Sequence, residues 1–354
     1  MPSSVVAMFD PPWAADSSVV SGRAATVLGM ETADADAAAL LEAARSGDEV
    51  AFEALMAPHR RALHLHCYRM LGSLTEAEEA LQDTLLRAWR SLHTYQARAP
   101  FHHWLFRIAT TTCLKSIERR NRTPTVLAEV GQLQPYPDRL LDELDPVHVV
   151  EQRESVALAF VAALQLLPAT QRAVVLLREV LCWSAAEVAD YLGTTVPAVN
   201  SALQRGRATL RSKAAPPERA LDAYEQRILR RFVRSWQRRD LDALAALLRE
   251  DAVLRMPPEP VEFVGRAAVI GFFATQPAGG RLERIRLVQT AANRQPALAA
   301  YLPDATGTCL GYGIMVLTIH PAGIAEITGF PNADVFGWFA LPPSHPPVNA
   351  PIHV

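Results

Sequence analysis

The 354-residue sequence has few cysteines and no long apolar segment, and these absences exclude several classes of protein. Its four cysteines, Cys67, Cys113, Cys182 and Cys309, are far apart and form no CxxC pair, which argues against a zinc site and a disulfide framework. No run of about 18 apolar residues occurs, so we expect no membrane span. Residues 1–35 lack the basic start and apolar core of a signal peptide. We therefore expect a cytoplasmic chain with a disordered N-terminal tail.

Charge is strongly segregated along the chain, although the net charge is only −2. Residues 55–122 carry eleven Lys/Arg and five Asp/Glu, residues 123–154 are acidic and rich in turn-forming residues, and residues 171–213 are basic again. Two basic blocks joined by an acidic segment favour two nucleic-acid contacts, because attraction to phosphates dominates such binding. Solvated helix surfaces are the alternative. The length predicts two or three domains.

A helix-turn-helix pattern occupies residues 182–210, CWSAAEVADYLGTTVPAVNSALQRGRATL. Ser184 and Glu187 have the spacing of a capping box at the start of the first helix. Gly193 suits the end of that helix, and Thr195 can cap the second. A supporting amphipathic helix is predicted within residues 164–181, starting at Pro168. The polar face of the second helix carries side chains that can reach base edges or phosphates from the major groove: Asn200, Ser201, Gln204, Arg205 and Arg207.

Two more helices are predicted upstream. In CYRMLGSLTEAEEALQDTLLRAWRSL, residues 67–92, Thr75 and Glu78 have capping-box spacing. The acidic and amide face of this helix suits a basic partner helix; it consists of Glu78, Glu79, Gln82 and Asp83. The helix predicted over 101–122, FHHWLFRIATTTCLKSIERRNR, starts with aromatic residues and ends in arginines. Aromatic side chains beside a cationic helix suit the capture of single-stranded bases.

These segments resemble the extracytoplasmic-function (ECF) sigma factors. LTEAEEALQDTLLRAWR is similar to region 2.2 of that family, FHHWLFRIATTTCLKSIERR to regions 2.3–2.4, and LPATQRAVVLLREVLCWSAAEVADYLGTTVPAVNSALQRGRATLR to region 4. Three motifs in the family's order make the resemblance specific over roughly residues 36–213. The resemblance implies a subunit that takes RNA polymerase to promoters and opens the DNA, without a catalytic residue, a metal or a cofactor.

The resemblance also implies a role for each surface. The acidic face, Glu78, Glu79, Gln82 and Asp83, would bind the β′ clamp helices of core RNA polymerase, and the β subunit is a further expected partner. The residues implied to hold the −10 element are Trp104, Arg107, Lys115, Arg119 and Arg120. Those implied to hold the −35 element are Asn200, Ser201, Gln204, Arg205 and Arg207. Thr111 and Lys115 stand where the family commonly has Asn and Asp, and His102 and His103 are unusual, so the resemblance does not carry over the exact −10 preference.

The residues after 213 predict an α+β domain. Helices are expected within 223–258 and over 266–275, followed by strands over 281–293, 295–303, 309–320 and 323–331. The phrases RRDLDALAALLREDAVLRMPP, EFVGRAAVIGFF and NRQPALAAYL resemble the SnoaL-like domain that is fused to one subgroup of ECF sigma factors, a cone with a hydrophobic cavity. Candidate lining residues are Trp236, Met256, Phe272, Phe273 and Tyr312, with ordinary core packing as the alternative. Whether an unknown small ligand binds in this cavity is left open.

Some SnoaL-like proteins are enzymes, so catalysis has to be considered. Asp251, Asp304, His320 and Glu326 show no acid–base pairing in the sequence, and fold alone does not confer chemistry. We therefore expect no enzyme activity. A regulatory domain that folds against the DNA-binding modules is favoured, because a tether gives an effective concentration on the order of millimolar.

The predicted fold is multidomain, with all-α region 2 and region 4 modules followed by an α+β SnoaL-like cone. The predicted boundaries are 1–35 for the disordered tail, 36–122 for region 2, 123–154 for an acidic flexible linker, 155–213 for the region 4 helix-turn-helix, 214–222 for a second linker, 223–341 for the SnoaL-like domain and 342–354 for a Pro-rich tail. Alternatives to a sigma factor are a stand-alone helix-turn-helix regulator with a ligand-sensing domain, and an enzyme.

Overall fold

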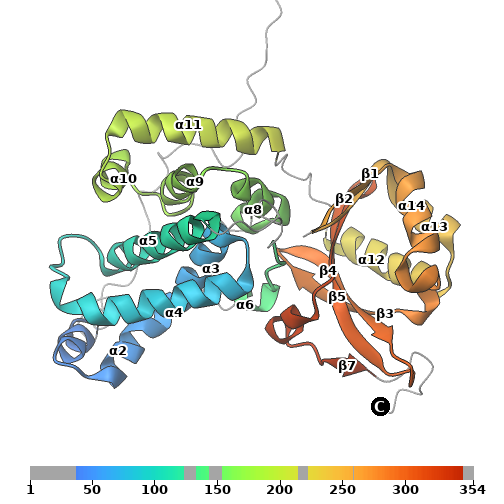
Figure 1. Ribbon diagram of the computed structural model, residues 1–354, viewed down its shortest axis with the longest axis horizontal. Coiled ribbons are helices and arrows are strands. Elements are labelled where there is room, and N and C mark those ends of the chain that lie inside the picture. Colours follow the sequence, from blue (N-terminus) through green and yellow to red (C-terminus); the bar gives the residue numbers. More distant parts are fainter. Residues whose placement is uncertain (1–36, 123–132, 143–153, 214–221, 258, 346–354) are drawn as a thin grey trace, which may run out of the picture. The chain divides into compact units, whose positions relative to one another are not determined.

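The computed structural model describes residues 37–122, 133–142, 154–213, 222–257 and 259–345 (Figure 1). The predicted N-terminal tail, most of both predicted linkers and most of the Pro-rich tail lie outside the described residues. The chain divides into two compact units. One unit contains the residues up to Pro58 together with Trp89–Thr94, and the other contains His59–Ala88 and the residues from Tyr95 onward.

The smaller unit is built on helix α2 (Glu49–Met56). Asp48 caps this helix, because its Oδ1 accepts the N–H groups of Val50 and Ala51 at 2.9 and 3.0 Å. Such a cap satisfies donors that have no partner inside the helix and contributes about 1 kcal/mol. Phe52 then packs edge-to-face on Trp89, with ring centroids 4.9 Å apart.

The first helices of the larger unit are α3 (Arg60–Leu71), α4 (Leu74–Ser91) and α5 (Phe101–Arg122). Helix α3 is the central one, because all nine residues from Leu63 to Leu71 are buried. A helix that is buried on every side lies inside a core. It ends at Gly72, whose φ of +80° closes the helix in the left-handed conformation that glycine adopts without strain.

The start of α4 differs from the prediction. Thr75 is exposed and is not the N-cap; instead the Ser73 hydroxyl accepts the N–H of Glu76 at 3.3 Å. The side-chain Oε1 of Gln134 also accepts the N–H of Leu74 at 2.7 Å. The predicted capping box of Thr75 and Glu78 is therefore wrong, and the helix is capped two residues earlier, at Ser73. The reason is tertiary, since a side chain 60 residues away satisfies the first donors of this helix.

Part of the predicted flexible linker is folded. Residues 133–142 include helix α6 (Asp138–Asp142), and Tyr136 is fully buried. The Gln134 carbonyl accepts the Tyr68 hydroxyl at 2.8 Å, and the rings of Tyr68 and Tyr136 lie 4.7 Å apart. The prediction of flexibility is therefore wrong for these residues, because an aromatic side chain in an otherwise acidic segment gains enough burial to anchor it.

Four helices follow, α8 (Leu158–Gln165), α9 (Ala169–Val175), α10 (Ala185–Leu192) and α11 (Val196–Lys213). Helix α9 starts after Pro168 as predicted, and it continues into a π-helical turn, Leu176–Val180. The capping box of Ser184 and Glu187 is confirmed, and Gly193 ends α10 at a φ of +62°. The side of α11 that packs on the other helices carries Val199, Leu203, Gly206 and Leu210, all buried.

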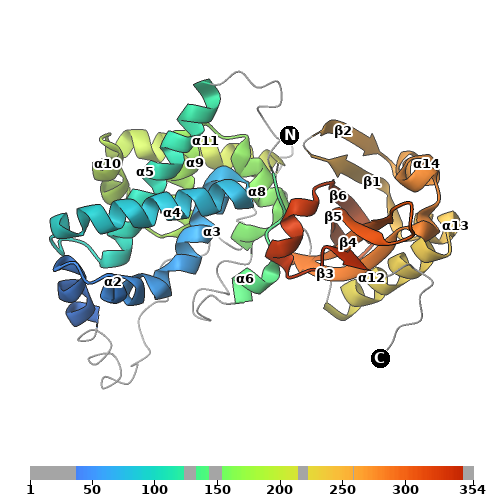
Figure 2. The ribbon, with the colours of Figure 1, turned by 60° about the horizontal axis from the view of Figure 1, so that its bottom comes forward.

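The C-terminal domain is α+β, as predicted. Its helices are α12 (Asp222–Gln237), α13 (Leu241–Ala245) and α14 (Arg266–Thr275). Its strands are β1 (Leu248–Met256), β2 (Glu259–Val264), β3 (Arg286–Ala292), β4 (Gln295–Pro303), β5 (Cys309–His320), β6 (Gly323–Phe330) and β7 (Ser344–His345). The sheet order is β2-β1-β6-β5-β4-β3, with β7 paired to β5. Strands β1 and β6 pair in parallel, and the other pairs of this described sheet are antiparallel. Figures 1 and 2 show the three helices on one side of the sheet.

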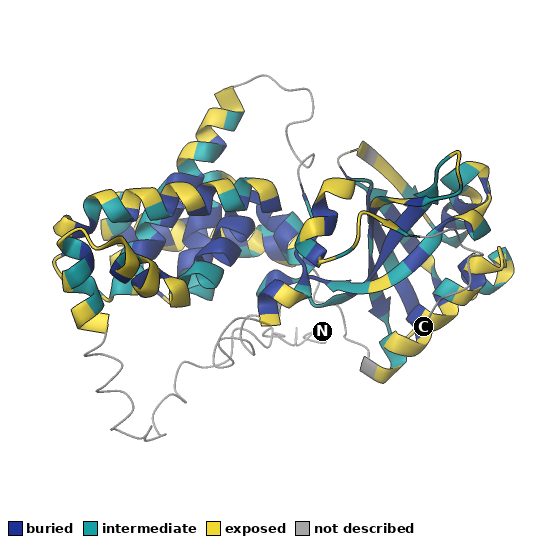
Figure 3. Cartoon of the chain, turned by 90° about the horizontal axis from the view of Figure 1, so that it is seen from below, coloured by how far each residue is buried: buried dark blue, intermediate teal, exposed yellow. Residues whose placement is uncertain are grey.

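Strands β1 and β2 were not predicted. Their sequences, LREDAVLRM and EPVEFV, carry charged residues on exposed positions, and the preceding helical pattern runs into the first of them. Between the helices and the sheet lies a core that includes Phe232, Trp236 and Phe273. Figure 3 shows the buried residues gathered on the inner sides of these elements.

The five predicted cavity residues do not share one lining. Trp236 and Phe273 are packed together in the core, with ring centroids 5.2 Å apart. The ring of Phe272 packs on that of Phe263, with the centroids 4.8 Å apart. Met256 is half-buried, and Tyr312 is 48% exposed. Ordinary core packing, the alternative reading, is therefore correct for Trp236 and Phe273.

Two buried histidines lie on α3. His66 Nε2 is 2.9 Å from the Thr110 hydroxyl, which itself donates to the Phe106 carbonyl. The Thr110 proton is thus in use, so His66 donates from Nε2. His64 Nδ1 lies 2.9 Å from the Tyr136 hydroxyl. Burial lowers the pKa of His64 to about 4 and that of His66 to about 3.

Gly206 makes a close helix contact that can be tested. A Cβ atom at this position of α11 would lie 2.5 Å from Cγ2 of Val175. We expect Gly206→Ala to lower the free energy of unfolding by about 1–2 kcal/mol, because overpacking exceeds the gain in helix propensity. Thermal melting followed by circular dichroism measures this. Gly271→Ala in α14 is the control, since no atom lies within 4 Å of its Cβ, and it should not lower the Tm.

The histidines predict an acid-sensitive core. Their pKa values are lower in the folded chain than the usual 6.5, so between about pH 6.5 and 5 the unfolded chain binds protons that the folded chain does not. The free energy of unfolding should therefore decrease as the pH is lowered from about 6.5 to 5, by up to about 2 kcal/mol for each histidine. Urea unfolding at several pH values measures the slope. His66→Gln should flatten it, whereas His93→Gln at an exposed position should leave it unchanged.

Candidate functional site

The predicted acidic face of α4 is largely open to solvent. Glu79, Gln82 and Asp83 are exposed, whereas Glu78 is only partly exposed. Gln82 Nε2 donates to Glu78 Oε1 at 3.0 Å, and Glu78 Oε2 lies 3.8 Å from His64 Nε2. The opposite side of α4 is buried, which fixes the direction of this face. Glu79, Gln82 and Asp83 therefore present a carboxylate and amide surface to a partner.

An aromatic cluster forms at the start of α5. The rings of Phe101 and Trp104 are stacked at 5.5 Å, and Tyr95 lies 5.2 Å from Phe101 and 5.5 Å from Trp104. The Tyr95 hydroxyl donates to the Ala99 carbonyl at 2.8 Å, which shapes the loop before the helix. Trp104 is half-buried in this cluster, so it supports the loop and exposes only part of its indole ring.

The cationic residues of α5 have different environments. Lys115 and Arg119 are exposed near its C-terminal part. Arg120 forms an ion pair with Glu76, at 3.1 Å between Nη1 and Oε2. Arg107 forms an ion pair with Asp190 at 2.7 Å. Arg107 and Arg120 are therefore each bound to a carboxylate of the same chain.

Helix α10 lies on the middle of α5. The Tyr191 hydroxyl is 2.9 Å from the Thr111 hydroxyl and donates to the Arg107 carbonyl at 2.9 Å. The guanidinium of Arg107 lies 5.2 Å from the centroid of the Tyr191 ring. One turn earlier, the rings of His103 and Trp183 are 4.7 Å apart. This contact covers part of the surface predicted to meet the −10 element.

Helix α11 presents most of its predicted polar face. Asn200, Ser201, Gln204 and Arg205 are all exposed. Arg207 is half-buried instead, because its guanidinium binds Glu179 of the π-helical turn at 2.6 Å. Arg211 is exposed seven residues after Gln204, on the same side of the helix. It was not among the predicted −35 residues.

Asn293 joins three distant parts of the chain. It is fully buried in the β3–β4 turn, where Asn293 and Arg294 have φ values of +57° and +59°. Its Oδ1 accepts the N–H of Tyr136 at 2.8 Å. Its Nδ2 donates to the Tyr68 hydroxyl at 3.1 Å and to the Val156 carbonyl at 2.7 Å. The amide thus connects the C-terminal domain to α3, to residues 133–142 and to the segment before α8.

Neighbouring residues strengthen this connection. The backbone N–H of Arg294 donates to Asp138 Oδ1 at 2.7 Å, and its guanidinium binds Asp142. Gln295 Oε1 accepts the N–H of Leu158, the first residue of α8, at 3.0 Å. The ring of Trp338 stacks on His64 at 5.6 Å. None of these residues was among the predicted site residues, and Asn293 was placed at the end of the strand predicted over 281–293. The one signal in the sequence is that asparagine tolerates the left-handed backbone of a tight turn.

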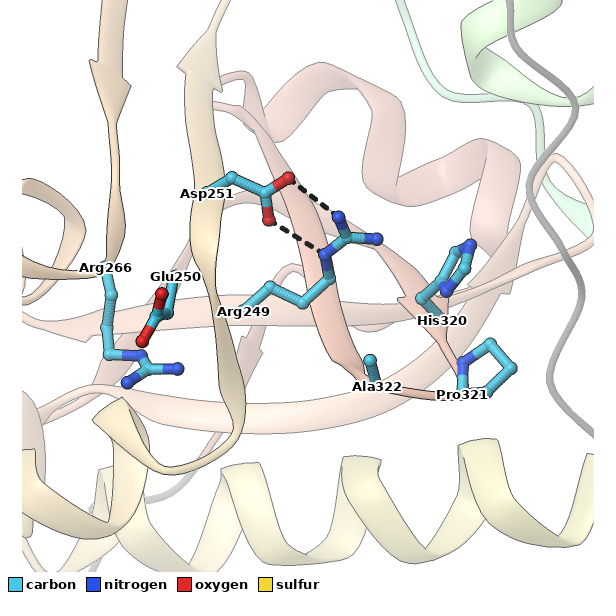
Figure 4. A pocket seen from close by; sticks show the side chains of 7 residues that line it. All are labelled: Arg249, Glu250, Asp251, Arg266, His320, Pro321 and Ala322. Atoms are coloured by element: carbon cyan, nitrogen blue, oxygen red, sulfur yellow. Dashed lines mark hydrogen bonds and ion pairs between the residues drawn. The ribbon is translucent and has the colours of Figure 1, made fainter.

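The C-terminal domain has an open groove of about 510 Å³ beside β1 and the β5–β6 turn (Figure 4). Asp251 and His320 line it, but Asp251 accepts two hydrogen bonds from Arg249, at 2.8 and 2.7 Å. These bonds lower the pKa of Asp251, which makes its carboxylate a weaker base. Glu326 binds Arg255 at 2.7 Å.

The Asp304 carboxylate has a structural role, because it accepts the N–H groups of Thr306 and Thr308 and stabilises a turn. Within the described residues, no group of three or more His, Cys, Asp or Glu is placed to hold a metal ion. In the same part of the chain, no helix is long and apolar enough to cross a bilayer.

Comparisons with known proteins agree with this architecture. The sigma-70 region 2 family matches residues 55–123, the sigma-70 region 4 family matches residues 157–210, and the SnoaL-like domain family matches residues 229–326. The Mycobacterium tuberculosis ECF RNA polymerase sigma factor SigG is 40% identical over 320 residues, 85% of each chain. SigM of the same organism is 32% identical over 180 residues, 51% of this chain and 84% of that one.

Among solved structures, the M. tuberculosis ECF sigma factor SigJ has a TM-score of 0.57 at 22% identity, covering 83% of this chain and all of that one. This likeness supports the fold, including an α+β domain after two helical modules. The identity and coverage of SigG support more than the fold, since they extend through all three matched regions. The chain belongs to the ECF RNA polymerase sigma factors, which direct core RNA polymerase to promoter DNA, and it carries a C-terminal SnoaL-like domain.

Proposed function

We propose that Glu79, Gln82 and Asp83, with Glu78 beside them, form the surface that binds the β′ clamp helices of core polymerase. The supporting observation is that this face of α4 is exposed while its other side is buried. Acidic side chains steer a basic helix into contact and set its register. Glu78 contributes less than the others, because it is partly covered and bonded to Gln82.

We further propose that the two DNA elements contact separate helices of this chain. Asn200, Ser201, Gln204 and Arg205 of α11 read the −35 element in the major groove, and Arg211 adds a phosphate contact. Arg207 supports the helix through Glu179 and does not face the DNA. On α5, the −10 contacts come from Trp104, Arg107, Lys115, Arg119 and Arg120.

The described arrangement is a closed state of the sigma factor. The observation that supports this proposal is the seating of α10 on α5, where Asp190 and Tyr191 hold Arg107. The Asp190 carboxylate and the Tyr191 ring cover the Arg107 guanidinium and compete with a phosphate for it. Promoter recognition therefore requires that α10 leave α5, which frees Arg107 and Thr111 for the −10 element.

The C-terminal domain holds this closed state and thereby represses the factor. Asn293 binds both Tyr136 and Val156, and Gln295 binds the first residue of α8. These bonds restrain the segments on either side of residues 143–153, which must change position when α10 moves. The domain acts as a binding module and not as an enzyme, because Asp251 and Glu326 are engaged by arginines. Because the factor acts with core polymerase, we infer that it works in the cytoplasm, and the proposed mechanism uses no cofactor.

Charge reversal tests the polymerase surface. Glu79→Lys with Asp83→Lys should weaken assembly with core polymerase at least tenfold, because like charges across an interface cost several kcal/mol. Fluorescence anisotropy of the labelled chain titrated with core measures the affinity. Asp242→Lys with Asp334→Lys is the matched control, with two exposed carboxylates of the C-terminal domain reversed. Equal loss in both variants would contradict the proposed surface.

Loosening the Asn293 contact tests the regulatory proposal. Asn293→Gly keeps the positive φ but leaves the Tyr136 N–H and the Val156 carbonyl without their partner, at about 1–3 kcal/mol each. We expect at least about fivefold more transcript from a promoter in vitro, because a loss of 1 kcal/mol already shifts a two-state equilibrium about fivefold, and a larger radius of gyration by small-angle scattering.

A chain that ends after Lys213 should also give more transcript than the full chain when promoter DNA is saturating. Output that is unchanged in both variants would refute repression by the C-terminal domain. Absence of RNA from the full chain and from both variants, with core bound normally, would count against the proposed promoter contacts.

A further inference from the structure

Helix α12 of the C-terminal domain carries a stripe of arginines along one side. Their sequence spacing of three, one, three and four residues places them within one arc of the helix. The last of them extends the stripe past the end of α12, because its N–H still donates to the Arg234 carbonyl at 3.2 Å. All five are exposed. This arginine stripe consists of Arg227, Arg230, Arg231, Arg234 and Arg238.

The opposite side of α12 is firmly packed. Ile228, Leu229, Phe232 and Trp236 are each at most 4% exposed and belong to the core of the C-terminal domain. The rings of Phe232 and Trp236 are stacked at 5.8 Å. The backbone that carries the arginines is therefore rigid, so a ligand would order only the side chains and not the helix.

The arginine stripe lacks neutralising carboxylates. Within the described residues, none of its five guanidinium groups forms an ion pair, and the one contact recorded for them is that of Arg227 with the ring of Tyr224, at 5.1 Å. Other arginines of the same domain are paired: Arg249 with Asp251, Arg255 with Glu262 and Glu326, and Arg294 with Asp142. In a chain of net charge −2, this stripe is an uncompensated positive surface.

The dimensions of the stripe match a DNA strand. From Arg227 to Arg238 the helix advances by about 16 Å, at 1.5 Å for each residue. Phosphates of one strand of a duplex are spaced by about 3.4 Å along the axis, so the stripe spans about five of them. Arginine also offers a planar fork of donors that fits phosphate oxygens.

Chain length limits where this stripe can lie. Helix α11 ends at Lys213 and α12 begins at Asp222, nine residues later. A fully extended chain of this length spans at most about 32 Å, which is less than one turn of duplex DNA, about 34 Å. When α11 occupies the major groove at the −35 element, the first residue of α12 is therefore held within about one turn of duplex from the end of α11.

We propose that the arginine stripe of α12 binds the phosphate backbone of duplex DNA next to the −35 element, as a third DNA contact that does not depend on sequence. The proposal rests on the −35 contact of α11 proposed above. It gives the C-terminal domain a second role: the domain that closes the free factor also strengthens the bound complex once the factor has opened.

Salt dependence tests the proposal on the full chain with core polymerase. Each phosphate contact contributes about 0.9 to the slope of log K against log salt concentration. Arg231→Gln with Arg234→Gln should therefore reduce the slope by about 1.8 and weaken promoter binding on the order of tenfold at physiological salt. The matched control is Arg249→Gln with Arg255→Gln, which removes two positive charges that already have carboxylate partners. We expect this control to keep the wild-type slope.

Hydroxyl-radical footprinting then locates the contact. Arg231→Gln with Arg234→Gln should lose backbone protection within about one turn of the −35 element, while protection of the element itself persists. A slope reduced equally in both variants would make the effect one of net charge and refute the proposal. Unchanged DNA binding with weaker binding to core would refute it in favour of a polymerase contact. Lack of −35 protection in the wild-type complex would instead refute the α11 contact.

Discussion

The buried amide of Asn293 is the constraint on which the described arrangement depends. Its carbonyl oxygen and its amino group bind three segments that are far apart in the sequence, at Tyr68, Tyr136 and Val156. A fully buried amide costs free energy unless its donors and acceptor are paired, so the three segments have to be in place together. An asparagine also tolerates the left-handed backbone of this hairpin turn better than most residues. One side chain thus connects the C-terminal domain to both helical modules.

Arginines have two distinct uses in this chain. Some are structural: Arg69 is buried and donates to Ser155, Arg172 is buried against Gln165, and Arg207 binds Glu179. Burial lowers the pKa of Arg69 to about 10, which still leaves it charged at neutral pH. Others, as along α12, are exposed and have no carboxylate partner in the part of the chain that the structure describes. A count of positive charges in the sequence cannot separate these groups, because the partner carboxylates come from other helices.

The proposed closed state would explain how a factor whose predicted −35 residues are exposed is controlled within one chain. Helix α11 keeps its polar face open, whereas Arg107 on α5 is held by Asp190 and Tyr191. The contacts that hold α10 are partly exposed, and ion pairs of this kind contribute at most about 1 kcal/mol. In the proposed mechanism, restraint by the C-terminal domain keeps the closed state populated, and loss of that restraint releases it.

The sequence by itself determined the family, the order of the modules and most helix boundaries. Capping residues, helical spacing and turn residues act locally, which is why the box at Ser184 and Glu187 could be recognised without a structure. Strands β1 and β2 were not predicted because their exposed positions are charged and because a helix precedes them without a strong break in the sequence. Tertiary structure alone decided which predicted site residues are free, such as Gln204, and which are engaged, such as Arg207. It also decided that residues 133–142 fold, because Tyr136 is buried by partners more than 60 residues away.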